Sequence, residues 1–213
     1  MELKGKKINF LGDSITEGVG CSDSKTVYHQ VMKEKHGLCE ARNYGIGGTR
    51  LAKQVKPSEN ARHDLDFPMR AVEMDKDADA VVVFGGTNDF GHGDAPIGTP
   101  SDRTPETFYG ALHYLYTYLM TEFPSARIFV CTPLHRLTEN TPDMKGKILS
   151  DYADMIKEVA RYYSLPVIDL YDIYGVQPSI DVQRETYMPD GLHPNDMGHI
   201  LLCDRIANFI LSY

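Results

Sequence analysis

Three residues that together could cleave an ester occur far apart in the chain: Ser14, Asp190 and His193. Ser14 follows the apolar run Ile8–Leu11, where a strand is expected to pass into a helix. A serine hydroxyl is a weak nucleophile at neutral pH and needs a base to accept its proton. His193 could accept that proton, and Asp190 could orient the imidazole from a position three residues earlier.

Two glycine-rich segments could supply the hydrogen-bond donors that such chemistry requires. They run over residues 43–48 (Asn-Tyr-Gly-Ile-Gly-Gly) and 85–89 (Gly-Gly-Thr-Asn-Asp), and each follows a predicted strand. Serine attack on a carbonyl creates an oxyanion, for which the N–H groups of Ser14 and Gly48 and the amide of Asn88 are candidate donors. The glycines permit positive φ and close backbone approach, although such a turn alone is more often purely conformational.

With these segments in place, the chain resembles the SGNH subgroup of GDSL-type esterases and lipases from Leu11 to His199. The family is named for Ser, Gly, Asn and His in four separate blocks, and Ser14, Gly48, Asn88 and His193 match them. An isoleucine follows the serine where the nominal motif has leucine. The resemblance implies a flavodoxin-like fold with strand order 2-1-3-4-5 and an acyl-enzyme on the serine.

Short apolar runs alternate with helical patterns, which is typical of βαβ units and a parallel sheet. Five runs predict strands: Lys7–Leu11, Arg42–Tyr44, Ala80–Phe84, Arg127–Cys131 and Pro166–Asp169. Several of these runs are continuously apolar, as expected for strands that are covered on both faces. We therefore expect one α/β domain of three layers (α/β/α) over residues 1–213, with Ser14, Gly48 and Asn88 converging beyond the carboxyl ends of the strands.

Three long amphipathic helices are predicted from their entry signals and apolar periodicity. Threonine-proline-acid sequences at Thr104 and Thr141 each offer an N-cap, a tolerated proline and an acidic first turn. The last helix is expected to begin near Asn195. The apolar positions that define the three helices are Phe108, Leu112, Leu115 and Leu119; Leu149, Tyr152, Ile156, Val159 and Tyr163; and Ile200, Cys203, Ala207 and Ile210.

The substrate rim is expected to come from three long segments, Phe90–Arg103, Pro133–Thr141 and Tyr171–Pro189. Their polar and aromatic composition favours a short-chain, acetyl-type ester of a carbohydrate or small metabolite over a lipid, which would need a broad apolar groove. Lysophospholipase, thioesterase and platelet-activating-factor-acetylhydrolase-like activities remain alternatives within the family. The candidate substrate contacts are Asp13, His92, Arg103, His135 and Arg136.

The residues disfavour two alternatives to ester hydrolysis, a cofactor-binding module and a non-catalytic relative of the hydrolases. A flavodoxin-like module would hold a phosphate-bearing cofactor at the first turn, where Asp13 opposes a phosphate and no phosphate-binding glycine motif follows the strand. A non-catalytic relative could have lost any catalytic residue, yet all are present. Asp13 and Asp89 could also form an acid pair or metal clamp, but no His/Asp/Glu cluster has ligand spacing. We predict neither a metal nor a cofactor.

The composition favours an ordinary folded chain with a small-molecule partner. Of 213 residues, 42% are hydrophobic and 24% charged, and the net charge of −8 disfavours nucleic acid and anionic membrane surfaces. No apolar stretch has the length of a signal peptide or membrane span, so a cytoplasmic location is expected. The sequence is compatible with a homo-oligomer as well as with a monomer.

The remaining histidines and the cysteines carry no recognisable site pattern. His29 and His36 are expected on a surface helix, and His113 and His199 within later helices, as solvated or packed imidazoles. The four cysteines, which lack a C-x-x-C pair, are expected to be buried free thiols; they are Cys21, Cys39, Cys131 and Cys203.

Overall fold

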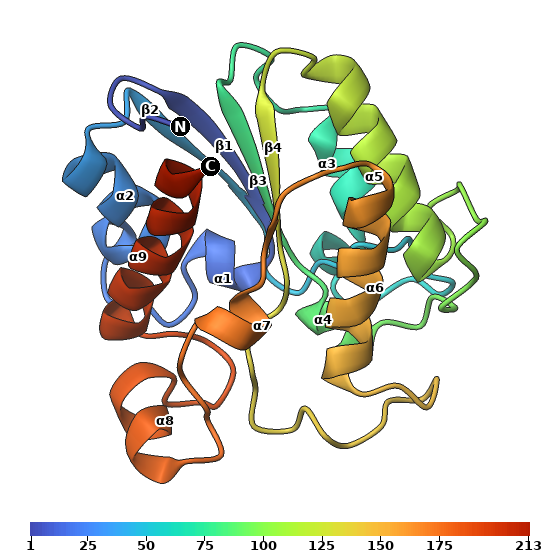
Figure 1. The fold of residues 1–213 in the computed structure, drawn as a ribbon. Coiled ribbons are helices and arrows are strands. Elements are labelled where there is room, and N and C mark those ends of the chain that lie inside the picture. The colour runs from blue at the N-terminus through green and yellow to red at the C-terminus, as the bar shows by residue number, and fades with distance from the viewer.

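The central sheet has five parallel strands in the order β2-β1-β3-β4-β5, which confirms the expected topology (Figure 1). The computed structural model describes residues 1–213. Gly12 at the end of β1 lies opposite Gly45 of β2 and Phe84 of β3, so three strands end at the same level. The strands are β1 (Lys7–Gly12), β2 (Glu40–Gly45), β3 (Ala80–Phe84), β4 (Arg127–Cys131) and β5 (Val167–Ile168).

Helices cover both faces of the sheet, giving the three expected layers. In Figure 1, α2 and α9 lie on one side, and α3, α5 and α6 on the other, with α8 below the sheet. The α-helices are α1 (Ser14–Glu17), α2 (Tyr28–His36), α3 (Phe67–Ala71), α4 (Thr87–His92), α5 (Phe108–Glu122), α6 (Leu149–Tyr162), α7 (Leu170–Ile173), α8 (Asp181–Tyr187) and α9 (Asp196–Ser212). Two 3-10 turns, η1 (Ser24–Thr26) and η2 (Ala61–Asp64), complete the fold. No helix combines the length and apolarity needed to cross a membrane.

The central strand β3 is buried on both faces, as its continuous apolar sequence predicts. Val82 and Phe84 pack into the core beneath α2 and α9, whereas Val81 and Val83 pack into the core beneath α5 and α6. Successive side chains of a strand point to opposite faces, so one apolar run supplies both cores. The sheet is thereby fixed between two helical layers.

The turn from β1 into α1 is shaped by local backbone demands. A Cβ on Gly12 would lie 2.0 Å from Thr16 Oγ1, so a larger residue would collide with the first helical turn. Asp13 caps the helix, because its Oδ1 accepts a hydrogen bond from Ile15 N at 3.0 Å. Gly18, with φ of 105°, ends the helix. These constraints place Ser14 at the first position of α1.

Two predicted helix starts are wrong, because the threonine-proline-acid segments form turns. Helix α5 is capped by Thr107 instead of Thr104, since Thr107 Oγ1 accepts a hydrogen bond from Gly110 N at 3.1 Å. Helix α6 begins at Leu149, well beyond Thr141. The Asp143 carboxylate accepts hydrogen bonds from two backbone N–H groups further along, at residues 145 and 147, and stabilises a turn there.

Several expectations about burial also need correction. His29 is not on a surface helix face: it is 1% exposed, with its ring packed beside Phe10. Cys39 is exposed and Cys21 half-buried, so only two of the cysteines are buried thiols. The segment Tyr171–Pro189, which is expected at the substrate rim, contains most of α7 and all of α8.

His29 gives the fold a pH dependence. Burial lowers its pKa to about 4, while a hydrogen bond to the Thr16 carbonyl opposes the shift. Unfolded histidine binds a proton near pH 6.5 and the folded protein does not until about pH 4, so stability is lost as the pH falls through that window. Urea unfolding gives the free energy of unfolding at pH 7 and at pH 5. The decrease from pH 7 to pH 5 should be about 2 kcal/mol smaller for His29→Gln than for the wild type. An identical fall in both proteins would contradict the prediction.

Candidate active site

Ser14, His193 and Asp190 form a continuous hydrogen-bonded chain at the carboxyl edge of the sheet. Ser14 Oγ lies 2.9 Å from His193 Nε2, and His193 Nδ1 lies 2.6 Å from Asp190 Oδ2. The serine and histidine are 179 residues apart in sequence. The structure therefore joins the start of α1 to the turn that precedes α9.

Asp190 is held by its own turn. Its Oδ1 accepts hydrogen bonds from Leu192 N at 2.9 Å and His193 N at 2.7 Å. Burial would raise the pKa of Asp190, but the hydrogen bonds from the backbone and side chain of His193 and from Leu192 N outweigh it and lower the pKa. The carboxylate is ionised at neutral pH and accepts the Nδ1–H of His193.

Gly48 and Asn88 border the same pocket as Ser14 and His193, in a cavity of about 350 Å³. Gly48 has φ of 75°, and its N–H makes no hydrogen bond within the protein. Asn88, in the first turn of α4, is 5% exposed and donates one amide hydrogen to Thr49 O at 3.0 Å. The second amide hydrogen of Asn88 is not engaged in that contact.

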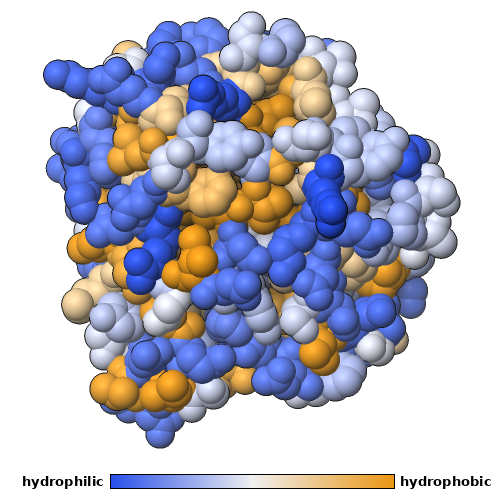
Figure 2. Space-filling view, viewed as in Figure 1, coloured by the Kyte–Doolittle hydropathy of each residue, from blue (hydrophilic) through white to orange (hydrophobic).

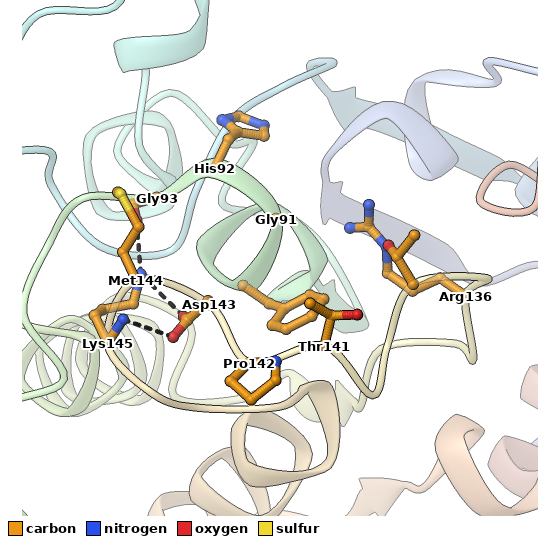
Figure 3. Close-up of a pocket in the computed structure, with 11 residues that line it drawn as sticks. Gly91, His92, Gly93, Arg136, Thr141, Pro142, Asp143, Met144 and Lys145 are labelled. Carbon is orange, nitrogen blue, oxygen red and sulfur yellow. Dashed lines mark hydrogen bonds and ion pairs between the residues drawn. The ribbon is translucent and has the colours of Figure 1, made fainter.

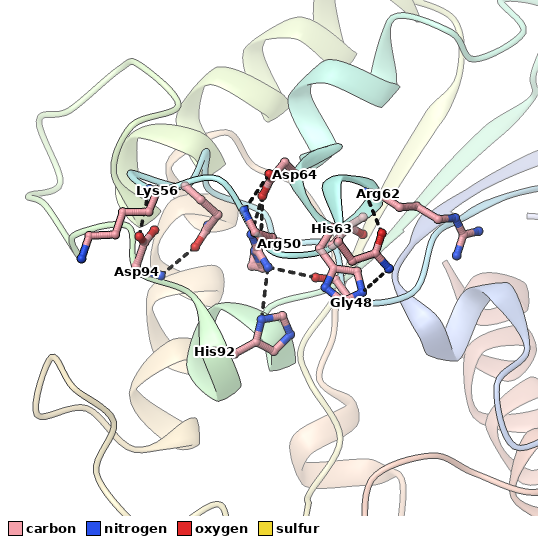
Figure 4. Close-up of polar contacts among 12 residues, drawn as sticks. Gly48, Arg50, Lys56, Arg62, His63, Asp64, His92 and Asp94 are labelled. Carbon is pink, nitrogen blue, oxygen red and sulfur yellow. Dashed lines mark hydrogen bonds and ion pairs between the residues drawn. The ribbon is translucent and has the colours of Figure 1, made fainter.

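The Gly48 turn is held from two sides, and Figure 4 shows the side on which Arg50 lies. On one side, Gly47 N donates to Glu17 Oε2 of α1 at 2.6 Å. On the other, Arg50, which is 3% exposed, donates to Gly48 O at 3.4 Å and pairs with Asp64 Oδ1 at 3.0 Å. These contacts fix the direction of the glycine backbone toward the pocket.

The glycines of this turn serve different purposes. Of Gly45, Gly47 and Gly48, only Gly48 has a positive φ. Gly45 and Gly47 instead allow close approach: a Cβ on Gly45 would lie 2.2 Å from Glu17 N, and one on Gly47 would lie 2.8 Å from Glu17 Oε2.

Asp13 and Asp89 support the backbone beneath the site. Asp89 accepts hydrogen bonds from Leu51 N and Ala52 N, both at 2.9 Å, and Asp13 caps α1. Burial raises the pKa of each carboxyl to about 6, although these N–H donors oppose the shift. Asp13 is only 2% exposed and, unlike Ser14, does not line the pocket. No group of three or more His, Cys, Asp or Glu side chains could hold a metal ion.

Of the other predicted substrate contacts, His92 and Arg136 line the pocket with Ser14. His135 and Arg103 do not. His135 Nδ1 lies 2.7 Å from Glu139 Oε2, and its ring packs on Tyr171 with centroids 4.0 Å apart. Arg103 donates to two carbonyl oxygens of its own loop.

Two buried arginines that hold the backbone of the site, Arg70 and Arg50, are not among the residues predicted from the sequence. Arg70 is 4% exposed and donates to Gly12 O at 3.1 Å and to Thr49 Oγ1 at 2.9 Å. Nothing in its local sequence distinguishes it from a surface arginine of a short helix. Arg50 carried a weak signal, because it follows the Gly48 turn by two residues.

The fold and this arrangement of side chains are typical of serine hydrolases with a flavodoxin-like sheet. The chain belongs to the GDSL-like lipase/acylhydrolase family, whose model matches residues 10–201. It is 28% identical to a GDSL lipase of Mycobacterium tuberculosis over 216 residues, which cover 99% of this chain and 84% of that protein. The family implies hydrolase activity.

Solved structures share the same fold. A protein from Lactobacillus plantarum is 30% identical with a TM-score of 0.85, covering 99% of this chain and 98% of that one. A lipase/acylhydrolase from Enterococcus faecalis is 22% identical with a TM-score of 0.64, covering 97% and 96%. The second likeness extends to the fold alone.

Arg50 should matter for both stability and catalysis. Arg50→Gln removes the partner of Asp64 and the donor to Gly48 O, and we expect a loss of about 2 kcal/mol in the free energy of unfolding. Turnover of p-nitrophenyl acetate should fall about tenfold in kcat, because the Gly48 turn is less well positioned. Arg184→Gln removes a pair with the exposed Asp181 and should stay within about 0.5 kcal/mol of the wild type. Urea unfolding and steady-state kinetics measure both effects; equal behaviour of the two variants would contradict the role given to Arg50.

Proposed function

We propose that the protein is a carboxylic-ester hydrolase that works through an acyl-enzyme on Ser14. The observation that carries the proposal is the hydrogen-bonded chain from Ser14 Oγ through His193 to Asp190. A serine next to an imidazole that is itself oriented by a carboxylate is the arrangement that activates a hydroxyl for acyl transfer.

In the first half-reaction, Ser14 Oγ attacks the ester carbonyl carbon while its proton passes to His193 Nε2. The imidazolium then gives this proton to the alcohol oxygen as the carbon–oxygen bond breaks, and the acyl group stays on the serine. In the second, water attacks the acyl carbon and loses a proton to His193, which returns it to Ser14 as the acid leaves. Asp190 stabilises the transient imidazolium through Nδ1–H.

The oxyanion formed in each half-reaction would be bound by the N–H groups of Ser14 and Gly48 and by the amide of Asn88. Support comes from the unengaged Gly48 N–H and from the anchoring of Asn88 on Thr49 O, which leaves its other amide hydrogen available. Donors fixed before the reaction stabilise the developing charge without reorganisation.

We further propose a short-chain ester, of acetyl type, of a carbohydrate or small metabolite. Only Val19 and Leu192 are apolar among the ten residues that line the pocket of about 350 Å³. On the face shown in Figure 2, the lower end is mainly polar with isolated apolar side chains, and it has no continuous apolar band of the kind that a long acyl chain would need. A two-domain esterase active on acetylated mannans has the same fold, at 23% identity and a TM-score of 0.65 over half of its chain.

The mechanism predicts loss of turnover without loss of structure. Ser14→Ala and His193→Ala should each lower kcat for p-nitrophenyl acetate by at least about a thousandfold, because both remove the activated nucleophile. Asp190→Asn should lower kcat by the same factor or by a smaller one. Circular dichroism and urea unfolding should show folded variants, and a Ser14→Ala variant as active as the wild type would eliminate the acyl-enzyme.

The substrate proposal predicts a decline with acyl length. Across p-nitrophenyl esters from acetyl to dodecanoyl, kcat/KM should be highest for the short acyl groups, because the small polar pocket offers little apolar surface to longer ones. Steady-state kinetics on the series, with Ser14→Ala as background, make the measurement. A maximum at long chains would instead favour a lysophospholipase or long-chain thioesterase.

A further inference from the structure

Arg136 stands out among the residues that line the pocket, because it carries a charge with no partner. Its Nη1 donates to the carbonyl and hydroxyl oxygens of Thr87 at 3.1 and 3.3 Å, while Nε and Nη2 make no hydrogen bond within the protein. No carboxylate lies within ion-pair distance of Arg136, whereas Arg50 nearby is paired with Asp64. Part of its donor capacity is therefore free at the pocket wall.

The guanidinium of Arg136 is held in place by helix α4. A Cβ on Gly91 would lie 2.8 Å from Nη1, so glycine at this position lets the guanidinium approach the helix closely. The Phe90 ring lies beside it, with the ring centroid 5.5 Å from Cζ. Together with the two bonds to Thr87, these contacts leave the side chain little freedom, which lowers the entropic cost of binding a ligand.

A second cavity adjoins the pocket at this arginine (Figure 3). It has about 300 Å³ and lies between α4 and residues 136–145, and Gly91, His92 and Arg136 line both spaces. Lys145 also lines it, but its ammonium is already bound to Gly93 O at 2.6 Å and Asp143 at 3.2 Å. Arg136 is thus the cation with free donors at the junction.

His92 adds a neutral donor beside the arginine. Its Nδ1 lies 3.1 Å from Arg50 Nη1, which can only donate, so the proton of the neutral ring is on Nε2. Burial, followed by the charge of Arg50, lowers the pKa of His92 to about 4, and the ring is uncharged at neutral pH. No group of the protein accepts the Nε2–H.

We propose that Arg136 binds a carboxylate carried by the substrate, so that the enzyme prefers short-chain esters of small anionic metabolites. A planar guanidinium with free donors suits a carboxylate, which can accept two parallel hydrogen bonds. The protein carries a net charge of −8, and Asp13 and Asp190 lie near Arg136, so an unpaired cation at this point is a local exception. A pocket of about 350 Å³ is small enough for one compact ligand to reach both Ser14 and Arg136. This inference rests on the proposed esterase function.

The kinetic test uses matched pairs of charged and neutral esters. On the alcohol side the pair is 4-acetoxybenzoate and methyl 4-acetoxybenzoate; on the acyl side it is mono-4-nitrophenyl glutarate and 4-nitrophenyl hexanoate. The ratio of kcat/KM within each pair is compared between proteins, which cancels the intrinsic reactivity of the esters. Arg136→Gln should lower the charged-to-neutral ratio of at least one pair by about tenfold to a hundredfold.

Two further variants separate hydrogen bonding from net charge. Arg136→Lys keeps the positive charge but lacks the planar guanidinium. Its charged-to-neutral ratio of kcat/KM should lie between those of the wild type and Arg136→Gln. Arg161→Gln removes one positive charge from an exposed position on α6 and should keep the wild-type ratio. Unchanged ratios in Arg136→Gln for both pairs, with normal Ser14-dependent turnover, would overturn the inference and leave the esterase function intact.

A binding measurement keeps the outcome independent of turnover. Calorimetric titration of Ser14→Ala with 4-acetoxybenzoate and with mono-4-nitrophenyl glutarate should give a Kd at least tenfold lower for one of them than in Ser14→Ala/Arg136→Gln. If the wild type hydrolyses no ester, the proposed function fails while this comparison still decides the role of Arg136. Equal Kd values in the two variants for both ligands would overturn it.

Discussion

The geometry of the site depends most directly on the hydrogen bonds that the buried guanidinium of Arg70 donates. It donates to the carbonyl oxygens of Gly12 and Tyr44 and to the hydroxyl of Thr49, so one side chain joins the ends of β1 and β2 to the glycine turn. Burial lowers its pKa to about 10, with nearby Asp13 and Asp66 opposing, and it stays charged at neutral pH. Charge-assisted bonds to carbonyls in a dry environment hold these three segments together.

The second half of the site reaches this edge from the far end of the chain. His193 and Asp190 precede α9, and Asp196 at the start of that helix accepts bonds from Ser22 Oγ at 2.5 Å and Thr26 Oγ1 at 2.6 Å. Those two hydroxyls lie in the connection between α1 and α2. The start of α9, which directly follows the histidine turn, is thus attached to the segment that follows α1, the helix in which Ser14 Oγ lies 2.9 Å from His193 Nε2.

The strands and the glycine turns that follow them could be predicted from local signals, namely continuous apolar runs and glycine-rich segments. The strand order rested on the resemblance to a family, and so did the choice of the four positions that match the motifs of that family. The start of α9 near Asn195 could also be predicted, whereas the starts of α5 and α6 could not. A threonine-proline-acid sequence suits a turn as well as a cap, and at Asp143 the carboxylate accepts hydrogen bonds from turn N–H groups. The distinction between Arg136, which faces the pocket, and Arg103, which bonds to its own loop, depends on the path of the backbone. Contacts between side chains that are far apart in the sequence cannot be deduced from the spacing of residues along the chain.

The wall of the second cavity at residues 136–145 is distant in sequence from Ser14, Gly48 and His193, and it follows β4 without forming part of the sheet. One backbone contact joins this segment to the turn that carries Asp190 and His193, because Leu137 N donates to Gly191 O at 2.8 Å. Residues 138–145 make no hydrogen bond to the catalytic residues themselves. Substitutions and insertions at residues 138–145 can therefore accumulate during evolution without removing a hydrogen bond of the catalytic residues. This one surface segment is therefore where we expect relatives to differ in substrate preference. It is also the segment to randomise first when a new substrate preference is to be selected in the laboratory.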